Sequence, residues 1–212
     1  MDVVIAGGHG QIALRLARLL SARGERVRAL IRNPDHAADV EAAGAEAVVA
    51  DMEELDDLSE FVSGADAVVF AAGAGPGSGP DRKWTMDHAG AVKLIAAAKA
   101  NGIDRYVMVS SMGADPDARG EDTFAVYQRA KGRADADLEA SGLGYTIVRP
   151  TSLTDDPATG RVQVGDDVGR GTIPREDVAA VLAAVLRSPN AIRKLFELRD
   201  GETSVEDAIA RL

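Results

Sequence analysis

The sequence predicts an α/β fold with a doubly wound, mostly parallel sheet, and two observations carry that prediction. First, short runs rich in β-branched residues alternate with longer amphipathic segments along residues 1–150. Second, the runs are almost continuously apolar, which is typical of parallel strands covered by helices on both faces. Alternation of such strands with amphipathic segments favours a sheet that carries helices on each side.

Six strands and five helices are expected in this part of the chain. The strands cover residues 2–6, 26–31, 45–50, 66–70, 105–110 and 145–150. The helices cover residues 11–22, 35–43, 54–62, 84–101 and 124–141. Gly24, Gly102 and Gly142 follow three of these helices, where glycine commonly supplies the cap. The stretch GAGPGSGP, residues 73–80, should form a mobile loop.

The last third of the chain differs in composition, because residues 151–173 are rich in Thr, Asp and Gly. We expect residues 151–212 to form a small appendage on the main sheet, within a single domain that spans 1–212. Its expected elements are short strands at 161–164 and 170–173, a helix at 175–187, a strand at 194–198 and a helix at 204–211.

Composition excludes several classes of function. The chain has no cysteine, which excludes a disulfide scaffold, a thiolate metal site and a cysteine nucleophile. Its net charge of −10 disfavours general binding to nucleic acid or to anionic membranes. The three histidines are scattered without metal-ligand spacing, so no metal site is expected.

The chain also lacks the patterns of an exported or membrane protein. No apolar run is long enough for a transmembrane helix. Residues 1–6 start a strand directly, without the basic region of a signal peptide. We therefore expect a cytoplasmic protein, a monomer or homodimer, that acts on a small molecule.

The corner after the first strand carries a nucleotide-binding pattern. Gly7, Gly10 and Ala13 form G-x-x-G-x-x-A between a strand and a helix. Glycines permit a tight turn and a close approach of pyrophosphate, and the helix N-terminus supplies N–H donors and a positive dipole end. The alternative is a turn without a ligand. The strand–turn–helix context favours the nucleotide.

The ends of the second and third strands refine the choice of cofactor. NAD-binding units usually carry an acidic residue after the second strand, whereas this chain has Arg32. A guanidinium binds a phosphate in a bidentate manner, so Arg32 favours NADP(H) over NAD(H). Asp51 can accept from the adenine amino group with Met52 packed on the ring, or it can cap the following helix.

Further small and polar residues follow the fourth and fifth strands. Ala71, Ala72 and Gly73 leave room for a cofactor, and Ser110 and Ser111 end the fifth strand. In an open α/β sheet these strand ends meet at one edge, where ligands bind. Because the candidate residues after all of these strands are expected at the same edge of the sheet, they support a single cofactor site.

Tyr127 and Lys131 lie four residues apart on the helix that follows, so they share one face. A nearby ammonium favours the ionised form of a phenol, so Tyr127 can exchange a proton with a substrate oxygen. Lys131 can also bind the nicotinamide ribose, and Ser111 can orient a substrate carbonyl. The alternative is a packed tyrosine and a solvated lysine, since this spacing also arises by chance.

The chain resembles the atypical short-chain dehydrogenase/reductases, in the NAD(P)H-binding group that includes NmrA-like and biliverdin/flavin-reductase-like proteins. The resemblance covers essentially the whole chain. The segments that carry it are IAGGHGQIA, VRALIRNP, VMVSSMGAD, YQRAKGRADADLEASGLGYTIVRP and REDVAAVLAAVL.

This resemblance implies a Rossmann-like sheet, NADP(H) and a substrate site over the C-terminal edge of the strands. It places Pro150, Thr151 and Leu153 beside the nicotinamide, although the family usually has glycine where this chain has Thr151. The expected cofactor contacts at the first corner are Gly7, His9, Gly10, Gln11 and Ile12.

The sequence thus predicts an NADP(H)-dependent oxidoreductase that transfers hydride between nicotinamide and a small carbonyl, quinone or flavin-like substrate. One alternative is a redox sensor that binds NADP(H) without catalysis. Another is a nucleotide-sugar epimerase or dehydratase with NAD. Arg32 and the short segment after residue 150 disfavour the second alternative.

Overall fold

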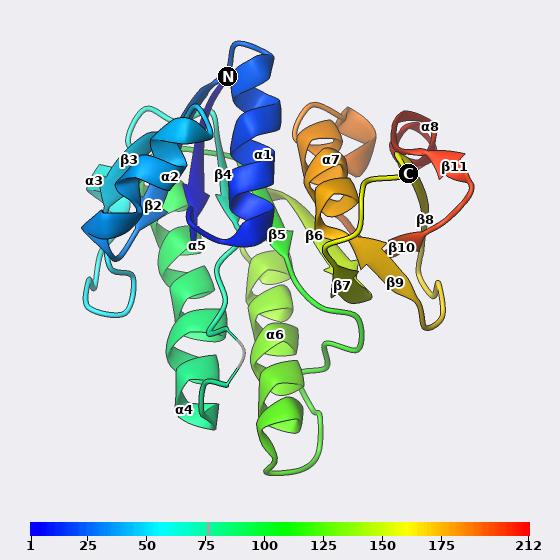
Figure 1. The fold of residues 1–212 in the computed structure, drawn as a ribbon. Helices are drawn as coiled ribbons and strands as arrows, with labels where there is room; N and C mark the ends of the chain where they lie inside the picture. The colour runs from blue at the N-terminus through cyan, green and yellow to red at the C-terminus, as the bar shows by residue number, and fades with distance from the viewer. Residues whose placement is uncertain (76) are drawn as a thin grey trace.

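The computed structural model describes residues 1–75 and 77–212, in which strands and helices alternate as predicted (Figure 1). The strands are β1 (Asp2–Ala6), β2 (Arg26–Ile31), β3 (Glu46–Val49), β4 (Ala67–Phe70), β5 (Arg105–Val109), β6 (Gly144–Pro150), β7 (Ser152–Thr154), β8 (Arg161–Gly165), β9 (Thr172–Pro174), β10 (Lys194–Asp200) and β11 (Thr203–Ser204). The α-helices are α1 (Gln11–Ala22), α2 (Ala37–Ala42), α3 (Ser59–Val62), α4 (Pro80–Arg82), α5 (Ala91–Ala100), α6 (Thr123–Ala140), α7 (Arg175–Val185) and α8 (Val205–Ala210). The π-helix η2 (Lys83–Gly90) joins α4 to α5, and η1 (Pro34–His36) and η3 (Pro189–Ala191) are 3₁₀ turns.

The main sheet confirms the predicted fold class. Within the described residues it has nine strands in the order β11-β8-β10-β6-β5-β4-β1-β2-β3. Strands β1 to β6 and β10 pair in parallel, whereas β8 pairs antiparallel with both of its neighbours, β10 and β11. The order reverses between β1 and β4, which is the switch point at which open α/β sheets bind ligands. The fold is Rossmann-like.

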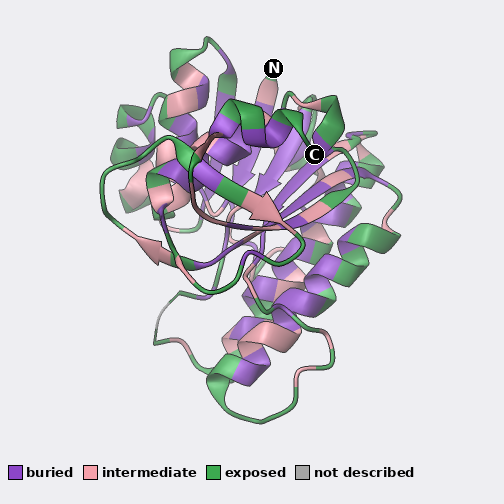
Figure 2. Ribbon diagram, turned by 90° about the vertical axis from the view of Figure 1, so that its right-hand side faces the viewer, coloured by how far each residue is buried: buried purple, intermediate pink, exposed green. Residues whose placement is uncertain are grey.

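Helices cover both faces of this sheet, and each face has its own apolar core. In β1, Val3 and Ile5 pack on the face covered by α1 and α7, while Val4 and Ala6 pack on the face covered by α5 and α6. Figure 2 shows the strands buried between helices whose outer sides are exposed. Burial on both faces explains why the strands are continuously apolar.

The C-terminal segment extends the main sheet. Strand β10 pairs in parallel with β6, and β8 and β11 continue the sheet beyond it. The parallel pair β7 and β9 forms a separate ribbon after the end of β6. Helix α7 packs against α1 on the same face of the sheet. The predicted appendage is therefore in large part a continuation of the sheet.

Two predicted helices differ from the structure. The helix predicted at 54–62 is wrong in its first part, because only α3 is helical. Asp51 accepts from the Glu53 N–H, and Lys93 donates to the carbonyls of Met52 and Leu55, so this segment is held as a turn. The helix predicted at 84–101 begins earlier and contains the π-helix η2. The predicted loop at 73–80 includes Pro76, which lies outside the described residues.

Within the part of the chain that the structure describes, no helix has both the length and the apolar composition needed to cross a membrane.

Candidate cofactor and substrate site

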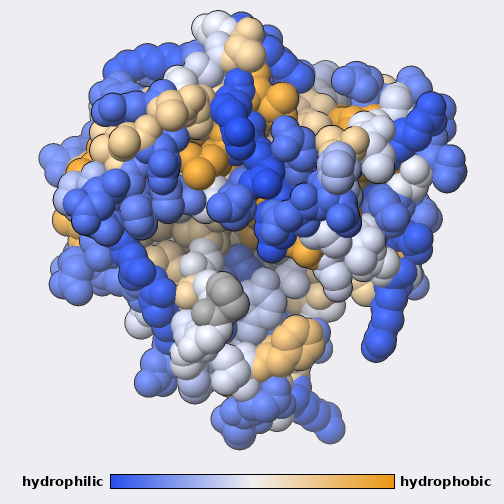
Figure 3. Space-filling view, in the orientation of Figure 1, coloured by the Kyte–Doolittle hydropathy of each residue, from blue (hydrophilic) through white to orange (hydrophobic). Residues whose placement is uncertain are grey.

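Two adjoining cavities lie at the carboxyl ends of the strands. The first, of about 300 Å³, is lined by the corners after β1, β2 and β3. The second, of about 530 Å³, is lined by segments after β4, β5 and β6 and by α6. Ala71–Gly75, which follows β4, lines both cavities and therefore connects them. In Figure 3 this side of the molecule is mostly hydrophilic, with a central hollow whose walls are neutral to apolar.

The glycine corner forms the floor of the first cavity. Gly7 has φ +78°, and a Cβ on it would lie 2.5 Å from the Cα of Ala72. A Cβ on Gly8 would lie 2.5 Å from the Cβ of Ala29, so neither position accepts a side chain. Among the described residues no side chain caps α1, and its first N–H groups stay available. The corner fits a pyrophosphate held by backbone donors and the helix dipole.

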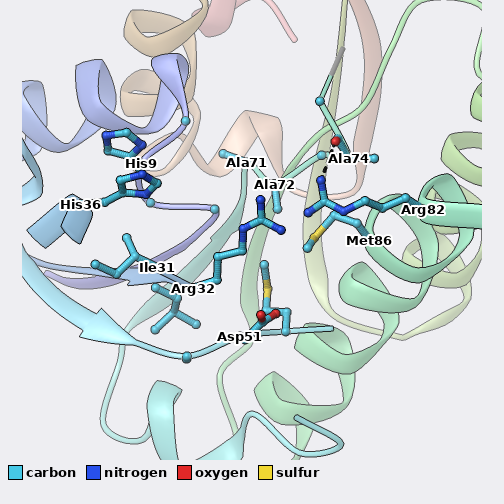
Figure 4. Close-up of a pocket in the computed structure, with 18 residues that line it drawn as sticks. His9, Ile31, Arg32, His36, Asp51, Ala71, Ala72, Ala74, Arg82 and Met86 are labelled. Carbon is cyan, nitrogen blue, oxygen red and sulfur yellow. Dashed lines mark hydrogen bonds between the residues drawn. The ribbon is translucent and has the colours of Figure 1, made fainter. Parts of the chain in front are cut away.

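Two arginines converge on one carboxylate at the rim of this cavity. Arg32 Nη1 lies 3.7 Å from Glu53 Oε2, and Arg82 binds the same oxygen through Nε at 2.9 Å and Nη2 at 2.7 Å. Arg82 also donates to the Ala74 carbonyl at 2.8 Å. Figure 4 shows the two guanidinium groups pointing toward one another. The Arg32 side chain is 54% exposed, so it is accessible to an anion.

The ion pairs change the acidity of Glu53. Partial burial would raise the pKa of Glu53, but the hydrogen bonds from Arg82 and Thr85 and the charges of both arginines outweigh burial. They hold the pKa of Glu53 below its ordinary value of 4.5. The same hydrogen bond to Glu53 raises the pKa of Arg82. Glu53 therefore stays ionised and fixes Arg82 at the cavity.

The opposite wall of the first cavity carries a pair of histidines. His9 and His36 stack with ring centroids 3.7 Å apart and an interplanar angle of 13° (Figure 4). His9 Nε2 lies 2.8 Å from Asp39 Oδ2. Asp51 and the buried Met52 also line the cavity, and the Asp51 carboxylate caps a turn instead of the helix considered from the sequence.

The second cavity brings Tyr127 and Lys131 together, as the spacing on α6 predicts. Ile12, Ser110, Pro150 and Leu153 also line it. The cavity thus combines residues from the corners after β1, β5 and β6 with one face of α6.

Lys131 is 3% exposed and has two protein partners. Its Nζ donates to the Val109 carbonyl at 3.2 Å and lies 3.3 Å from Asp87 Oδ1. Burial lowers the pKa of Lys131, but the negative charges of Asp87 and Asp135 more than compensate, and the net pKa is raised. Lys131 therefore remains a cation in the wall of the second cavity.

Ser110 is tied to a second buried carboxylate. Its hydroxyl donates to Asp135 Oδ2 at 2.9 Å, and Arg149 Nε donates to the same oxygen at 2.8 Å. Burial raises the pKa of Asp135 in spite of the Arg149 charge. Because the Ser110 proton is engaged with Asp135, the oxygen of Ser110 faces the cavity as an acceptor.

The structure does not bring three of the predicted residues into either cavity. Ser111 lies beyond the end of β5 and donates to the Met112 carbonyl, whereas Ser110 lines the second cavity. Gln11 accepts from Arg15 on the surface of α1. Thr151 is buried, and its N–H donates to the Leu198 carbonyl in β10. The remaining predicted site residues all line one cavity or both.

Sequence reasoning missed residues that come from helices. Lys83, Met86 and Asp87 on η2 line the cavities, as do Arg82 on α4 and Phe124 on α6. No strand-end context marks these positions, because they lie inside or beside a helical pattern. π-Helical turns are frequent at functional sites, but the π-helix η2 is visible only in the structure.

Comparison with known proteins identifies the family. A family model described as NAD(P)H-binding matches residues 7–189, which is most of the chain. The chain belongs to this NAD(P)H-binding family, and the resemblance to atypical short-chain dehydrogenase/reductases is confirmed.

Three relatives span essentially the whole chain. YhfK of Bacillus subtilis, named an uncharacterized sugar epimerase, is 39% identical and covers 100% of both chains. A solved structure from Bacillus halodurans with a provisional NAD-dependent epimerase/dehydratase name is 39% identical, with TM-score 0.92 and 100% of both chains covered. The oxidoreductase ylbE from Lactococcus lactis is 26% identical, with TM-score 0.86 over 100% of this chain and 96% of that chain.

Proposed function

From its membership of the NAD(P)H-binding family, we propose that the protein is an NADP(H)-dependent oxidoreductase that reduces a small carbonyl, quinone or flavin-like substrate. One observation carries the proposal: the cavity at the glycine corner and the cavity at Tyr127 share Ala71–Gly75. A dinucleotide bound at the corner would therefore have its reactive end directed along this segment to Tyr127. The name of the Lactococcus lactis relative supports the same reaction class.

The first cavity would hold the adenosine half of the cofactor. Gly7 and Gly10 leave the backbone accessible to pyrophosphate, and Asp51 and Met52 offer an acceptor and an apolar surface for the adenine. Arg32 occupies the position where NAD-binding units carry an acid, and it supports a preference for a 2′-phosphate. When bound, the nicotinamide supplies a hydride to the substrate.

In the second cavity, Tyr127 would act as the proton donor. The Tyr127 hydroxyl would give its proton to the substrate oxygen during reduction and would later regain a proton from solvent. Lys131 is held as a cation by Asp87 and stabilises the phenolate left on Tyr127. The Ser110 oxygen and the apolar wall of Ile12, Pro150 and Leu153 would position the reacting groups.

The test measures the oxidation of NADPH through the loss of its absorbance, with a panel of aldehydes, quinones and flavins as acceptors. We expect tight NADPH binding and turnover with at least one class of acceptor. Tight binding with no turnover on any acceptor would contradict the proposal and would favour the redox sensor.

A second candidate is an epimerase or dehydratase acting on a nucleotide sugar, which the names of the two Bacillus relatives favour. The segment after β6 mostly extends the sheet, which leaves little chain for a sugar-nucleotide domain. Such an enzyme converts a nucleotide sugar without net consumption of cofactor. Product analysis after incubation with nucleotide sugars separates the two reactions.

A further inference from the structure

The second cavity contains two buried lysines, and their partners differ. Lys131 pairs with the carboxylate of Asp87. Lys83 is also buried, at 8% exposure, but its Nζ donates to neutral oxygens, the Gly75 carbonyl at 3.1 Å and the Ser78 hydroxyl at 2.8 Å. In residues 1–75 and 77–212 no carboxylate forms an ion pair with Lys83.

This arrangement leaves a positive charge at the cavity that is not neutralised. A buried charge is costly unless it is paired, and neutral acceptors compensate only part of the cost. An ammonium has three donors, and two are engaged in Lys83. Among the described residues the third N–H has no acceptor and the charge has no carboxylate partner, so both are available to a bound group.

The surroundings of Lys83 are aromatic. Its Nζ lies 5.5 Å from the centroid of the Tyr127 ring. Phe124, one helical turn before Tyr127, lines the same cavity with its ring centroid 6.3 Å from that of Tyr127, yet it is 63% exposed. An exposed aromatic ring at a cavity offers a surface on which a flat ligand stacks. Most of the remaining wall is apolar and includes Ile12 and Leu153, and its charged residues are Asp87 and Lys131, which pair with each other.

We propose that Lys83 binds an anionic group of a planar aromatic or quinonoid substrate whose ring lies among Phe124, Tyr127 and the apolar wall. The proposal deepens the proposed function, on which it rests for the assignment of this cavity to the substrate. It narrows the acceptors to flat carbonyl compounds that carry a carboxylate or a comparable anion. The preference for an anion arises from Lys83 at this cavity and not from the overall charge of the chain, which is negative.

The experiment compares two probes of the same shape, one with an anionic group and one with a neutral group. Naphthalene carboxylate and the isosteric naphthalene carboxamide are titrated by calorimetry into protein saturated with NADP⁺. In the wild type we expect the carboxylate to bind about ten-fold more tightly, as a charge-assisted hydrogen bond predicts. In Lys83→Gln the two probes should bind within about two-fold of each other, and Lys83→Arg should keep most of the preference.

Lys93→Gln is the matched control, because Lys93 also donates to two neutral carbonyls but lies outside both cavities. This variant should keep the wild-type preference. Equal binding of both probes to the wild type, no binding of either, or a preference that survives in Lys83→Gln would overturn the proposal.

Two further readouts separate this proposal from the proposed function. NADPH affinity should be unchanged in Lys83→Gln, since Lys83 does not line the first cavity. If no acceptor oxidises NADPH but the carboxylate preference depends on Lys83, the oxidoreductase function fails and the anion site stands. If an acceptor oxidises NADPH but the wild type shows no preference for the carboxylate, the oxidoreductase function stands and the anion site fails.

Discussion

The two cavities that share Ala71–Gly75 are built from different kinds of chain segment. The first is formed mainly by consecutive strand-to-helix corners, each close in sequence to the strand that positions it. The second depends on how η2 and α6 pack against the strand ends, so residues far apart in sequence meet there. The cofactor half is thus set largely by local backbone geometry, whereas the substrate half is set by tertiary packing.

The cavities also differ in how they manage charge. At the rim of the first, Arg32 and Arg82 share Glu53 in partly exposed ion pairs. In the second, Lys131 and Asp87 form a buried ion pair, with Asp87 only 1% exposed. Exposed pairs can exchange partners at little cost, while a broken buried pair leaves an uncompensated charge. The first cavity can therefore adapt to a phosphate, and the second keeps a fixed electrostatic field.

The largest effect is expected from a side chain at the glycine corner. Gly7→Ala introduces a Cβ 2.5 Å from the Ala72 backbone at φ +78°. Left-handed strain costs about 1–2 kcal/mol and overpacking about 1–3 kcal/mol, so we expect a loss of about 2–5 kcal/mol in the free energy of unfolding. NADPH affinity should fall by roughly 100-fold or more, because the pyrophosphate cradle is displaced.

Gly24→Ala is the control for this substitution. Gly24 has φ +77°, but nothing lies within 4 Å of an added Cβ. Only the strain of about 1–2 kcal/mol is expected, with NADPH binding unchanged. Denaturant unfolding and fluorescence titration measure both quantities. Equal losses of unfolding free energy and of NADPH affinity in the two variants would show that the close packing at Gly7 contributes to neither quantity.

A smaller effect is expected at the end of β2. Arg32→Ala should weaken NADPH binding by about 10- to 100-fold, the range expected for lost charge-assisted hydrogen bonds, and leave NADH binding nearly unchanged. Arg26→Ala removes the same charge from the other end of β2 and should change neither affinity. A parallel fall in NADPH and NADH affinity on Arg32→Ala would exclude Arg32 as the selector of the phosphate.

The smallest effect is expected at Glu53. Glu53→Gln frees both arginines, so NADPH should bind about two- to five-fold more tightly. The pKa of Glu53 lies below 4.5 in the folded protein, so its ion pairs contribute stability above pH 4.5. That contribution is lost as the pH falls through the lower, folded pKa.

Thermal unfolding from about pH 6 to about pH 3 measures this dependence. The wild type should melt above Glu53→Gln at the upper end, and the difference should shrink toward the lower end. Glu54→Gln, at an exposed neighbouring position, should show no such trend. A Glu53→Gln difference that grows as the pH falls would contradict the assigned ion pairs.

The sequence predicted the first cavity better than the second, for a physical reason. Strand ends and glycine corners follow from local patterns, so Gly7, Gly10 and Arg32 could be placed at one edge. The pair Tyr127 and Lys131 could be placed on one face because helical spacing is local as well. The doubly wound, mostly parallel fold class could also be predicted, since strand–helix alternation favours it.

The features that could not be predicted depend on long-range contacts. Lys93 holds residues 52–55 in a turn, which an acidic, helix-like sequence does not reveal. The π-helix orients Lys83 and Asp87 toward the second cavity. Ser110, not Ser111, lines the second cavity, where it bonds Asp135 on α6. The pairing of β10 with β6 joins segments separated by more than forty residues.

The most direct test of the account is a comparison of Tyr127→Phe with Tyr145→Phe, a tyrosine change on β6 outside both cavities. Both variants are assayed for NADPH affinity and for turnover with the best acceptor of the panel. Tyr127→Phe should lower turnover by about 100-fold or more while NADPH affinity stays within about two-fold, as loss of a general acid predicts. Tyr145→Phe should match the wild type. Full turnover in Tyr127→Phe would contradict the central claim that Tyr127 is the proton donor.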